Sequence, residues 1–366
     1  MIPTGYNDTN CQAALDYDST IIQDHEEPDF ENCNTDNGES VMNVVNQLYK
    51  EVDFNREFMD SATQITIADI EIPFITLINS PKKLRTMTGI PTFQFLEKII
   101  EIYKTEFPDK RKHNLNYKER IIMVFLKLRQ DFSFVVLSIL FKNVTAESCR
   151  MIYSSLIPCL AKILSCSIYW PSKEEIISNM PYCFKKFPNT RVILDCTEIP
   201  IQKPKCLSCC IKLYSNYKST FILKFLIGVS PGGLITYISQ PYGCRASDKS
   251  IFEQSGLIQK MNSSDAIMVD KGFLIDDLCM SKNIQIIRPP FLKNKIQFSK
   301  SEALLNKYIA SARIHIERFN QRLKVYKILQ NIFIWSHNYL AFDILTIISG
   351  ICNLSTPIFA NDKFSV

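Results

Sequence analysis

The sequence lacks a hydrophobic run long enough to cross a membrane. Its most apolar stretch, LAFDILTIISGICNL (340–354), has 15 residues and contains Asp343, whereas a spanning helix needs about 20 apolar residues. We therefore expect a buried helix there. The first residues, MIPTGYNDTN, have neither a basic start nor an apolar core, so no signal peptide and no membrane partner are predicted.

Histidine is scarce, and the cysteines are not arranged as in a zinc finger. The chain has four isolated histidines and 13 cysteines, an odd number scattered among apolar neighbours. With no export signal, this predicts reduced thiols in the cytosol or nucleus. The segment KCLSCCIK, with Cys206, Cys209 and Cys210, offers half of a zinc site, but no second CxxC or HxxxH pair follows it. Structural zinc on this cluster is the minor alternative.

The start of the chain has few basic residues. Residues 1–60 contain 14 acidic and two basic residues, a net charge of −12, whereas the remaining 306 residues carry +17. Residues 1–42 are polar and aperiodic, which predicts a disordered acidic arm. A strongly basic body predicts contact with a polyanion. The alternative, that the basic charge serves only solubility, stays open.

Residues 43–185 predict an all-helical region. It contains a helix-turn-helix-like pair at about 131–166, whose two helices are joined by residues 142–144, with Ser133 and Thr145 as N-caps. The second helix of such a pair can enter a DNA major groove. Since it offers only Arg150 as an early basic residue, a packing role is the stronger alternative.

Residues 186–366 predict an α/β domain with a mixed sheet and flanking helices. RVILDCTEIPI has the pattern of a buried strand. FILKFLIGVS and LITYISQPYG read as a hairpin around Pro231-Gly232-Gly233. Shorter helices and strands follow, and a long helix at about 300–328 closes the set.

Three acidic residues stand out by position. Asp195 lies inside one apolar strand, Asp270 ends another, and Glu317 lies on the closing helix. A buried carboxylate is costly unless it is paired or holds a metal. If the three converge, Mg²⁺ or Mn²⁺ is the natural occupant, and two such ions can clamp a phosphoryl displacement. The alternative is that each aspartate is an ion-paired or capping residue.

The closing helix gathers its charges on one side. In SARIHIERFNQRLK (311–324), Arg313, Glu317 and Lys324 fall within a wedge of about 40° at about 100° per residue. The arrangement suits a carboxylate that binds metal while its neighbours hold phosphates. An adjacent apolar stripe would anchor the helix on the sheet and consists of Ile309, Ile316 and Leu323.

From about 91 to 357, the sequence resembles the PIF/Harbinger-like DDE transposases, whose catalytic domain is a DDE superfamily endonuclease. The resemblance is carried by WPSKEEIISNMPYCFKKFPNTRVILDCTEIPIQKP, YSNYKSTFILKFLIGVSPGGLITYIS, YGCRASDKSI, MVDKGF and IASARIHIERFNQRLKVYKIL. The 47 residues from Asp270 to Glu317 also match the family's spacing. The closing helix is similar to the YREK signature of bacterial insertion-sequence transposases, except that Ala310 replaces its tyrosine.

The resemblance implies an RNase H-like fold in which Asp195, Asp270 and Glu317 bind two divalent metal ions and catalyse DNA cleavage and strand transfer. It implies a supporting role for Asp248. We expect DNA as the partner, a homo-oligomer on DNA, a Myb-like accessory protein and a nuclear location. The residues expected to bind DNA are Arg313, Arg318, Lys324, Lys218 and Lys271.

This sequence also departs from the family pattern. Lys271 stands where members have arginine, which removes bidentate phosphate contact. Phe319 and Gln321 occupy places where members have small residues. Two alternatives to an active transposase follow: a domesticated DNA-binding or adaptor protein without transposition, and a zinc-stabilised structural protein.

Overall fold

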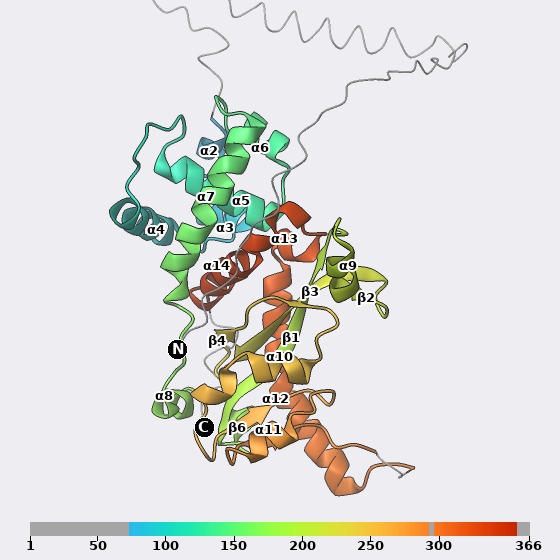
Figure 1. Cartoon of the computed structure of the whole chain (residues 1–366). Helices are drawn as coiled ribbons and strands as arrows, with labels where there is room; N and C mark the ends of the chain where they lie inside the picture. Colours follow the sequence, from blue (N-terminus) through green and yellow to red (C-terminus); the bar gives the residue numbers. More distant parts are fainter. Residues whose placement is uncertain (1–72, 293–295, 357–366) are drawn as a thin grey trace, which may run out of the picture. The chain divides into compact units, whose positions relative to one another are not determined.

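A computed structural model describes residues 73–292 and 296–356 (Figure 1). The predicted acidic arm, 1–42, and the start of the predicted helical region lie outside these residues. The described part opens with helices. Their bounds are α2 Phe74–Leu77, α3 Pro81–Thr88, α4 Phe93–Glu106, α5 Tyr117–Gln130, α6 Phe134–Leu140, α7 Ala146–Ser165, α8 Lys173–Ser178 and the 3₁₀ turn η2 Tyr182–Phe184.

The predicted helix pair is formed by α6 and α7. Both expected caps are present: Ser133 Oγ accepts from the Val136 N–H (3.2 Å), and Thr145 Oγ1 accepts from the Ser148 N–H (3.1 Å). Such caps satisfy N–H groups that lack partners in the first turn. Arg150 forms an ion pair with Glu147 on the exposed face of α7. DNA reading by this pair stays a prediction.

One mixed sheet follows the helices. Its strands are β1 Thr190–Ile201, β2 Tyr214–Ser215, β3 Thr220–Val229, β4 Ile235–Ile238, β5 Tyr242–Gly243, β6 Ala266–Met268 and β7 Gln285–Ile287. The order is β2-β3-β1-β6-β7, with β4 and β5 also paired to β3. β1 is antiparallel to β3 and parallel to β6, and β6 is in turn parallel to β7. The expected hairpin joins β3 to β4, and Gly233 supplies its positive φ of 89°.

The remaining helices lie between and after the strands. They are α9 Leu207–Leu213, α10 Asp248–Gln254, η3 Leu257–Lys260, α11 Asp276–Met280, α12 Lys300–Lys324, α13 Lys327–Gln330, η4 Trp335–Leu340 and α14 Ala341–Asn353. A capping box of Ser299 and Glu302 starts α12. This helix ends at Lys324, short of the expected 328, and α13 begins after the break. The predicted buried helix is α14. Within the described ranges, no helix has the length and apolarity needed to cross a membrane.

β1 separates two hydrophobic cores. Ile193 packs into the larger core, together with Ile316 and Leu323 of the predicted stripe on α12. Val192 and Leu194 face the smaller core, which lies under α10 and α11. Because side chains alternate along a strand, odd-numbered residues of this part of β1 face α12. The larger core also contains residues of α3 to α7, and the expected division at 185/186 into two domains stays a prediction.

Candidate active site

Asp195 lies on the α12 side of β1. Asn320 Nδ2 of α12 donates to Asp195 Oδ2 (2.7 Å), and the Cys196 N–H donates to Asp195 Oδ1 (2.9 Å). Burial raises the pKa of Asp195, and the nearby Asp270 adds to the rise. The two hydrogen bonds and the charge of Arg313 oppose it. Asp195 is therefore a partly buried carboxyl group whose ionised form is stabilised by Arg313 and Asn320 of α12.

Asp270 lies near Asp195, two residues after the end of the neighbouring strand β6. β1 and β6 pair in parallel with Ile193 opposite Met268, so the same register two residues later brings positions 195 and 270 together. Arg313 Nη1 donates to Asp270 Oδ1 (2.9 Å), as does the Lys271 N–H (2.7 Å). The Asp270 side chain is 52% exposed and that of Arg313 is 15% exposed. The two aspartates thus lie near each other in the central part of the sheet.

Glu317 lies between the two contacts that α12 makes with these aspartates. Arg313 and Asn320 are seven residues, or about two helical turns, apart and share one face. Glu317 is four residues after Arg313 and three before Asn320, so it belongs to that face. Its side chain is exposed. The structure thus places Asp195 and Asp270 at the junction of the sheet with α12, and along the helix axis Glu317 lies between the residues that contact them; its convergence with the two aspartates stays a prediction.

The described residues contain no group of three or more His, Cys, Asp or Glu side chains arranged to hold a metal ion. At this junction, the Arg313 guanidinium lies on Asp270 and balances its charge. The donor set itself consists of carboxylate oxygens, which hard divalent cations prefer. Asp270 Oδ2 accepts no hydrogen bond from the described residues, and neither does Glu317.

Comparisons with known proteins point to the same segment. Residues 194–353, which include all three acids, match the family described as DDE superfamily endonuclease. This segment is therefore similar to a DDE superfamily endonuclease domain. The chain is also 24% identical over 259 residues to a protein of Microchaete diplosiphon named "Probable transposase for insertion sequence element IS702"; the match covers 68% of this chain and 86% of the relative. No solved structure gives a significant match. The two matches support an enzyme of the nuclease/transposase class.

Asn320 belongs to this site but was not predicted from the sequence. It bridges the helix and the strand, because its Oδ1 accepts from Thr197 Oγ1 (2.7 Å) while its Nδ2 donates to Asp195. One signal was available: Asn320 lies about 20° from Arg313 around the helix, on the side opposite Glu317. Because its side chain is neutral, Asn320 does not stand out among the charged residues of the same face.

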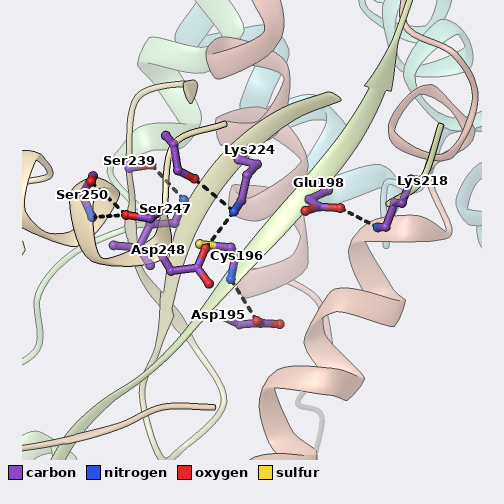
Figure 2. A network of polar contacts seen from close by, with 11 residues as sticks. Asp195, Cys196, Glu198, Lys218, Lys224, Ser239, Ser247, Asp248 and Ser250 are labelled. Atoms are coloured by element: carbon purple, nitrogen blue, oxygen red, sulfur yellow. Dashed lines mark hydrogen bonds and ion pairs between the residues drawn. The ribbon is translucent and has the colours of Figure 1, made fainter. Parts of the chain in front are cut away.

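Asp248 lies on the other side of β1 from Asp195. It is the first residue of α10 and pairs with Lys224 Nζ of β3 (2.8 Å), beside the Cys196 sulfur (Figure 2). Burial lowers the pKa of Lys224, but the hydrogen bond and charge of Asp248 outweigh it and raise that pKa. Burial, followed by Asp248, also raises the pKa of Cys196. A partly buried ion pair thus lies on the face of β1 opposite Asp195.

The basic residues expected to bind DNA do not form one cluster in the described structure. Lys218 pairs with Glu198 of β1 (Figure 2). Lys271 lies over the Phe291 ring, with 5.4 Å from Nζ to the centroid. Lys324 is exposed at the end of α12, about 16 Å along the helix from Arg313. Arg318 lines a separate cavity. Among these five residues, only Arg313 contacts an acid of the site through its side chain in the described structure, and its binding to DNA stays a prediction.

The cysteine segment lies at α9. Cys206 Sγ is 2.9 Å from Ser208 Oγ, and Cys210 Sγ donates to the Pro204 carbonyl (3.0 Å). Hydrogen bonding from Ser208 and then Cys209 lowers the pKa of Cys206 to about 7. Cys210 points to the backbone instead of joining the other two thiols, so the segment does not present a three-cysteine site for zinc.

Proposed function

We propose that the chain is a metal-dependent DNA endonuclease and transposase of the PIF/Harbinger type, with Asp195, Asp270 and Glu317 as its catalytic acids. The observation that carries the proposal is the contact of α12 with both aspartates. Arg313 contacts Asp270 and Asn320 contacts Asp195, while Glu317 lies between them on the same helical face.

We further propose that the catalytic domain is RNase H-like. Support comes from the order of the strands. An antiparallel β4-β3-β1 meander is followed by β6 and β7, which run parallel to β1. β1 is therefore central. Asp195 lies on β1, and Asp270 follows the end of the adjacent strand β6. Parallel neighbours are about 4.8 Å apart, which is close enough for their carboxylates to share ligands.

The residues fit Mg²⁺ or Mn²⁺ held by the three carboxylates. Two carboxyl groups side by side cannot both ionise freely without a cation nearby, and burial already raises the pKa of Asp195. Two bound ions would supply an activated water and a stabilised leaving oxygen for phosphodiester hydrolysis and strand transfer. Because metal ligands must be deprotonated, the groups that favour ionised Asp195 also favour metal binding.

The surrounding side chains hold the acids in place. Asn320 fixes the Asp195 carboxylate against the helix, and Thr197 fixes Asn320 in turn. Arg313 neutralises Asp270 in the absence of another cation and can turn to a DNA phosphate when one takes its place. Lys271 directly follows Asp270, and Lys324 lies seven residues, or about two helical turns, after Glu317; both are exposed. We propose that they hold phosphates of the strand being cut.

The proposed partner is DNA, which agrees with the charge of +17 outside residues 1–60 and with the transposase named as a relative. Assembly into a homo-oligomer on DNA, a Myb-like accessory protein and a nuclear location belong to the same proposal. They rest on the family resemblance and not on a contact within the chain.

A nicking assay tests the proposed function. The full chain is incubated with supercoiled DNA, with and without Mg²⁺ or Mn²⁺, beside Glu317→Gln and the matched control Glu253→Gln, which changes an exposed acid on α10. We expect metal-dependent nicking by the parent and the control, and loss of at least 100-fold in Glu317→Gln, with unchanged circular dichroism. Nicking by Glu317→Gln at the parental rate would refute the site assignment. Metal-dependent binding without nicking by the parent would indicate a DNA-binding adaptor.

A further inference from the structure

A cavity of about 410 Å³ lies beside the C-terminal half of α12. Four arginines from three helices line it: Arg85 of α3, Arg129 of α5, and Arg318 and Arg322 of α12. The buried Tyr326 also contributes to its wall. No acidic side chain is among the lining residues. We call this cavity the arginine pocket.

Two of the arginines are held in place by neutral groups. Arg322 Nη2 donates to the Thr356 carbonyl (2.9 Å) and Nη1 to the Cys352 carbonyl (3.3 Å). The Arg129 guanidinium lies over the Tyr326 ring, 4.9 Å from its centroid. Burial raises the pKa of Tyr326, whereas Arg129, Arg322 and Arg85 oppose the rise, so all three act on the same hydroxyl. The pocket is therefore preorganised and positively charged.

Ion pairing with the residues that the structure describes does not offset this charge. Among the described residues, none of the four arginines forms an ion pair with an aspartate or glutamate. Like charges gathered in a concave, partly apolar wall repel one another more strongly than on an open surface. An anion with several charges would relieve that repulsion, whereas a chloride or a single carboxylate would neutralise only one guanidinium.

Phosphate is the anion that fits the donor geometry. A guanidinium presents parallel N–H groups that bind two phosphate oxygens at once, and arginine keeps its charge at any physiological pH. The cavity volume is within the range of small-ligand sites, about 300–1,000 Å³, and it has room for more than one phosphate group. We propose that the arginine pocket is a phosphate-binding site, separate from the carboxylate site, for two or more adjacent phosphates.

Two sources can present this chemistry. One is the backbone of a DNA strand. Arg318 directly follows Glu317 on α12 and is rotated by about 100° from it around the helix axis. A DNA strand bound at the carboxylates would therefore reach the pocket within one to two turns of α12. This source rests on the proposed function. The other source is a free oligophosphate such as a nucleoside triphosphate, which requires no DNA cleavage.

The test uses the full chain and three variants. Arg85→Gln and Arg318→Gln each remove one pocket charge, whereas Arg111→Gln removes an equivalent exposed charge outside the pocket. Thermal unfolding by circular dichroism identifies any variant that does not fold. The first probe is sodium tripolyphosphate, titrated calorimetrically into each protein. The second is a labelled DNA duplex, whose binding is followed by fluorescence anisotropy over a salt series.

We expect tripolyphosphate to bind the parent and Arg111→Gln equally, and each pocket variant at least tenfold more weakly. If DNA is the source, tripolyphosphate also competes with DNA. The logarithm of the association constant for DNA, plotted against the logarithm of the salt concentration, then has a slope whose magnitude is smaller by about 0.9 for each arginine lost from the pocket. If a free oligophosphate is the source, the DNA slope is the same in all four proteins.

The proposal is overturned if the four proteins have equal DNA salt slopes and tripolyphosphate either fails to bind or binds all four with the same affinity. The carboxylate site is tested separately, because Glu317→Gln should keep both phosphate readouts while losing nicking. Failure of the arginine pocket and failure of the proposed nuclease are thus distinguished.

Discussion

Asn320→Ala is the perturbation that tests most directly how α12 controls the site. The side chain makes two hydrogen bonds of 2.7 Å, one to Asp195 and one from Thr197. A hydrogen bond to an ionised group stabilises by about 1.5–3 kcal/mol, and one between neutral groups by about 0.5–1.5 kcal/mol. We therefore expect the free energy of unfolding to fall by about 2–4 kcal/mol at neutral pH.

The loss should depend on pH in a definite direction. Burial raises the pKa of Asp195 in the folded protein, so the stability associated with this group is fully present below the ordinary aspartate pKa. It is lost as pH rises through the raised value. Removal of the Asn320 donor raises the folded-state pKa further. The stability deficit of Asn320→Ala therefore grows with pH, and the acidic limb of its nicking profile moves to higher pH.

A double-mutant cycle measures the coupling. Urea unfolding is recorded for the parent, Asn320→Ala, Asp195→Asn and the double variant, at acidic and at mildly basic pH. We expect Asn320→Ala to cost about 1 kcal/mol less in the Asp195→Asn background, since only a neutral bond is lost there. The same cost in both backgrounds and at both pH values would refute the role of Asn320 as a partner of ionised Asp195.

Two further predictions concern contacts on either side of α12. In Arg313→Gln, the loss of a positive charge that lowers the pKa of Asp195 should shift the acidic limb of DNA nicking to higher pH, and an unchanged pH profile would contradict this electrostatic role. In Gly89→Ala, a Cβ would lie 2.2 Å from Tyr326 Oη at a φ of +81°, so we expect a loss of more than about 1 kcal/mol in urea unfolding. Gly272→Ala, where nothing lies within 4 Å, is the matched control and should change stability by less than about 0.5 kcal/mol; equal losses in the two variants would exclude the Tyr326 contact.

Local signals in the sequence predicted much of the fold correctly. Ser133 and Thr145 cap their helices, and the Pro231-Gly232-Gly233 turn joins an antiparallel pair. Each of these features depends on residues that are neighbours in the chain. The apolar stripe on α12 was also predictable, because Ile309, Ile316 and Leu323 repeat at helical spacing and are all buried.

Contacts between distant segments could not be read in this way. The sequence placed Arg313 with the phosphates, but it could not show that the guanidinium would lie on Asp270, 43 residues away. The arginine pocket is further out of reach, since Arg85 and Arg318 meet only after α3 and α12 have packed. Nothing in either local sequence distinguishes these arginines from solvated ones. The end of α12 at Lys324 was misjudged because residues 325–328 are also apolar or helix-forming.

The position of Glu317 follows from packing instead of from contacts of its own. The buried stripe on α12 repeats every seven residues, from Ile309 to Ile316 to Leu323, and the two residues that reach the aspartates, Arg313 and Asn320, are also seven apart. An ideal helix drifts by only about 20° over seven residues, so the polar row keeps its angle to the stripe. Once the stripe is buried against β1, the rotation of α12 is fixed. Glu317 then lies between the two contacts along the helix axis and about 40° further from the stripe than Arg313. A carboxylate that is exposed and has no hydrogen bond or ion pair with the described residues can therefore occupy a defined place, because the core beneath it determines the rotation of the helix.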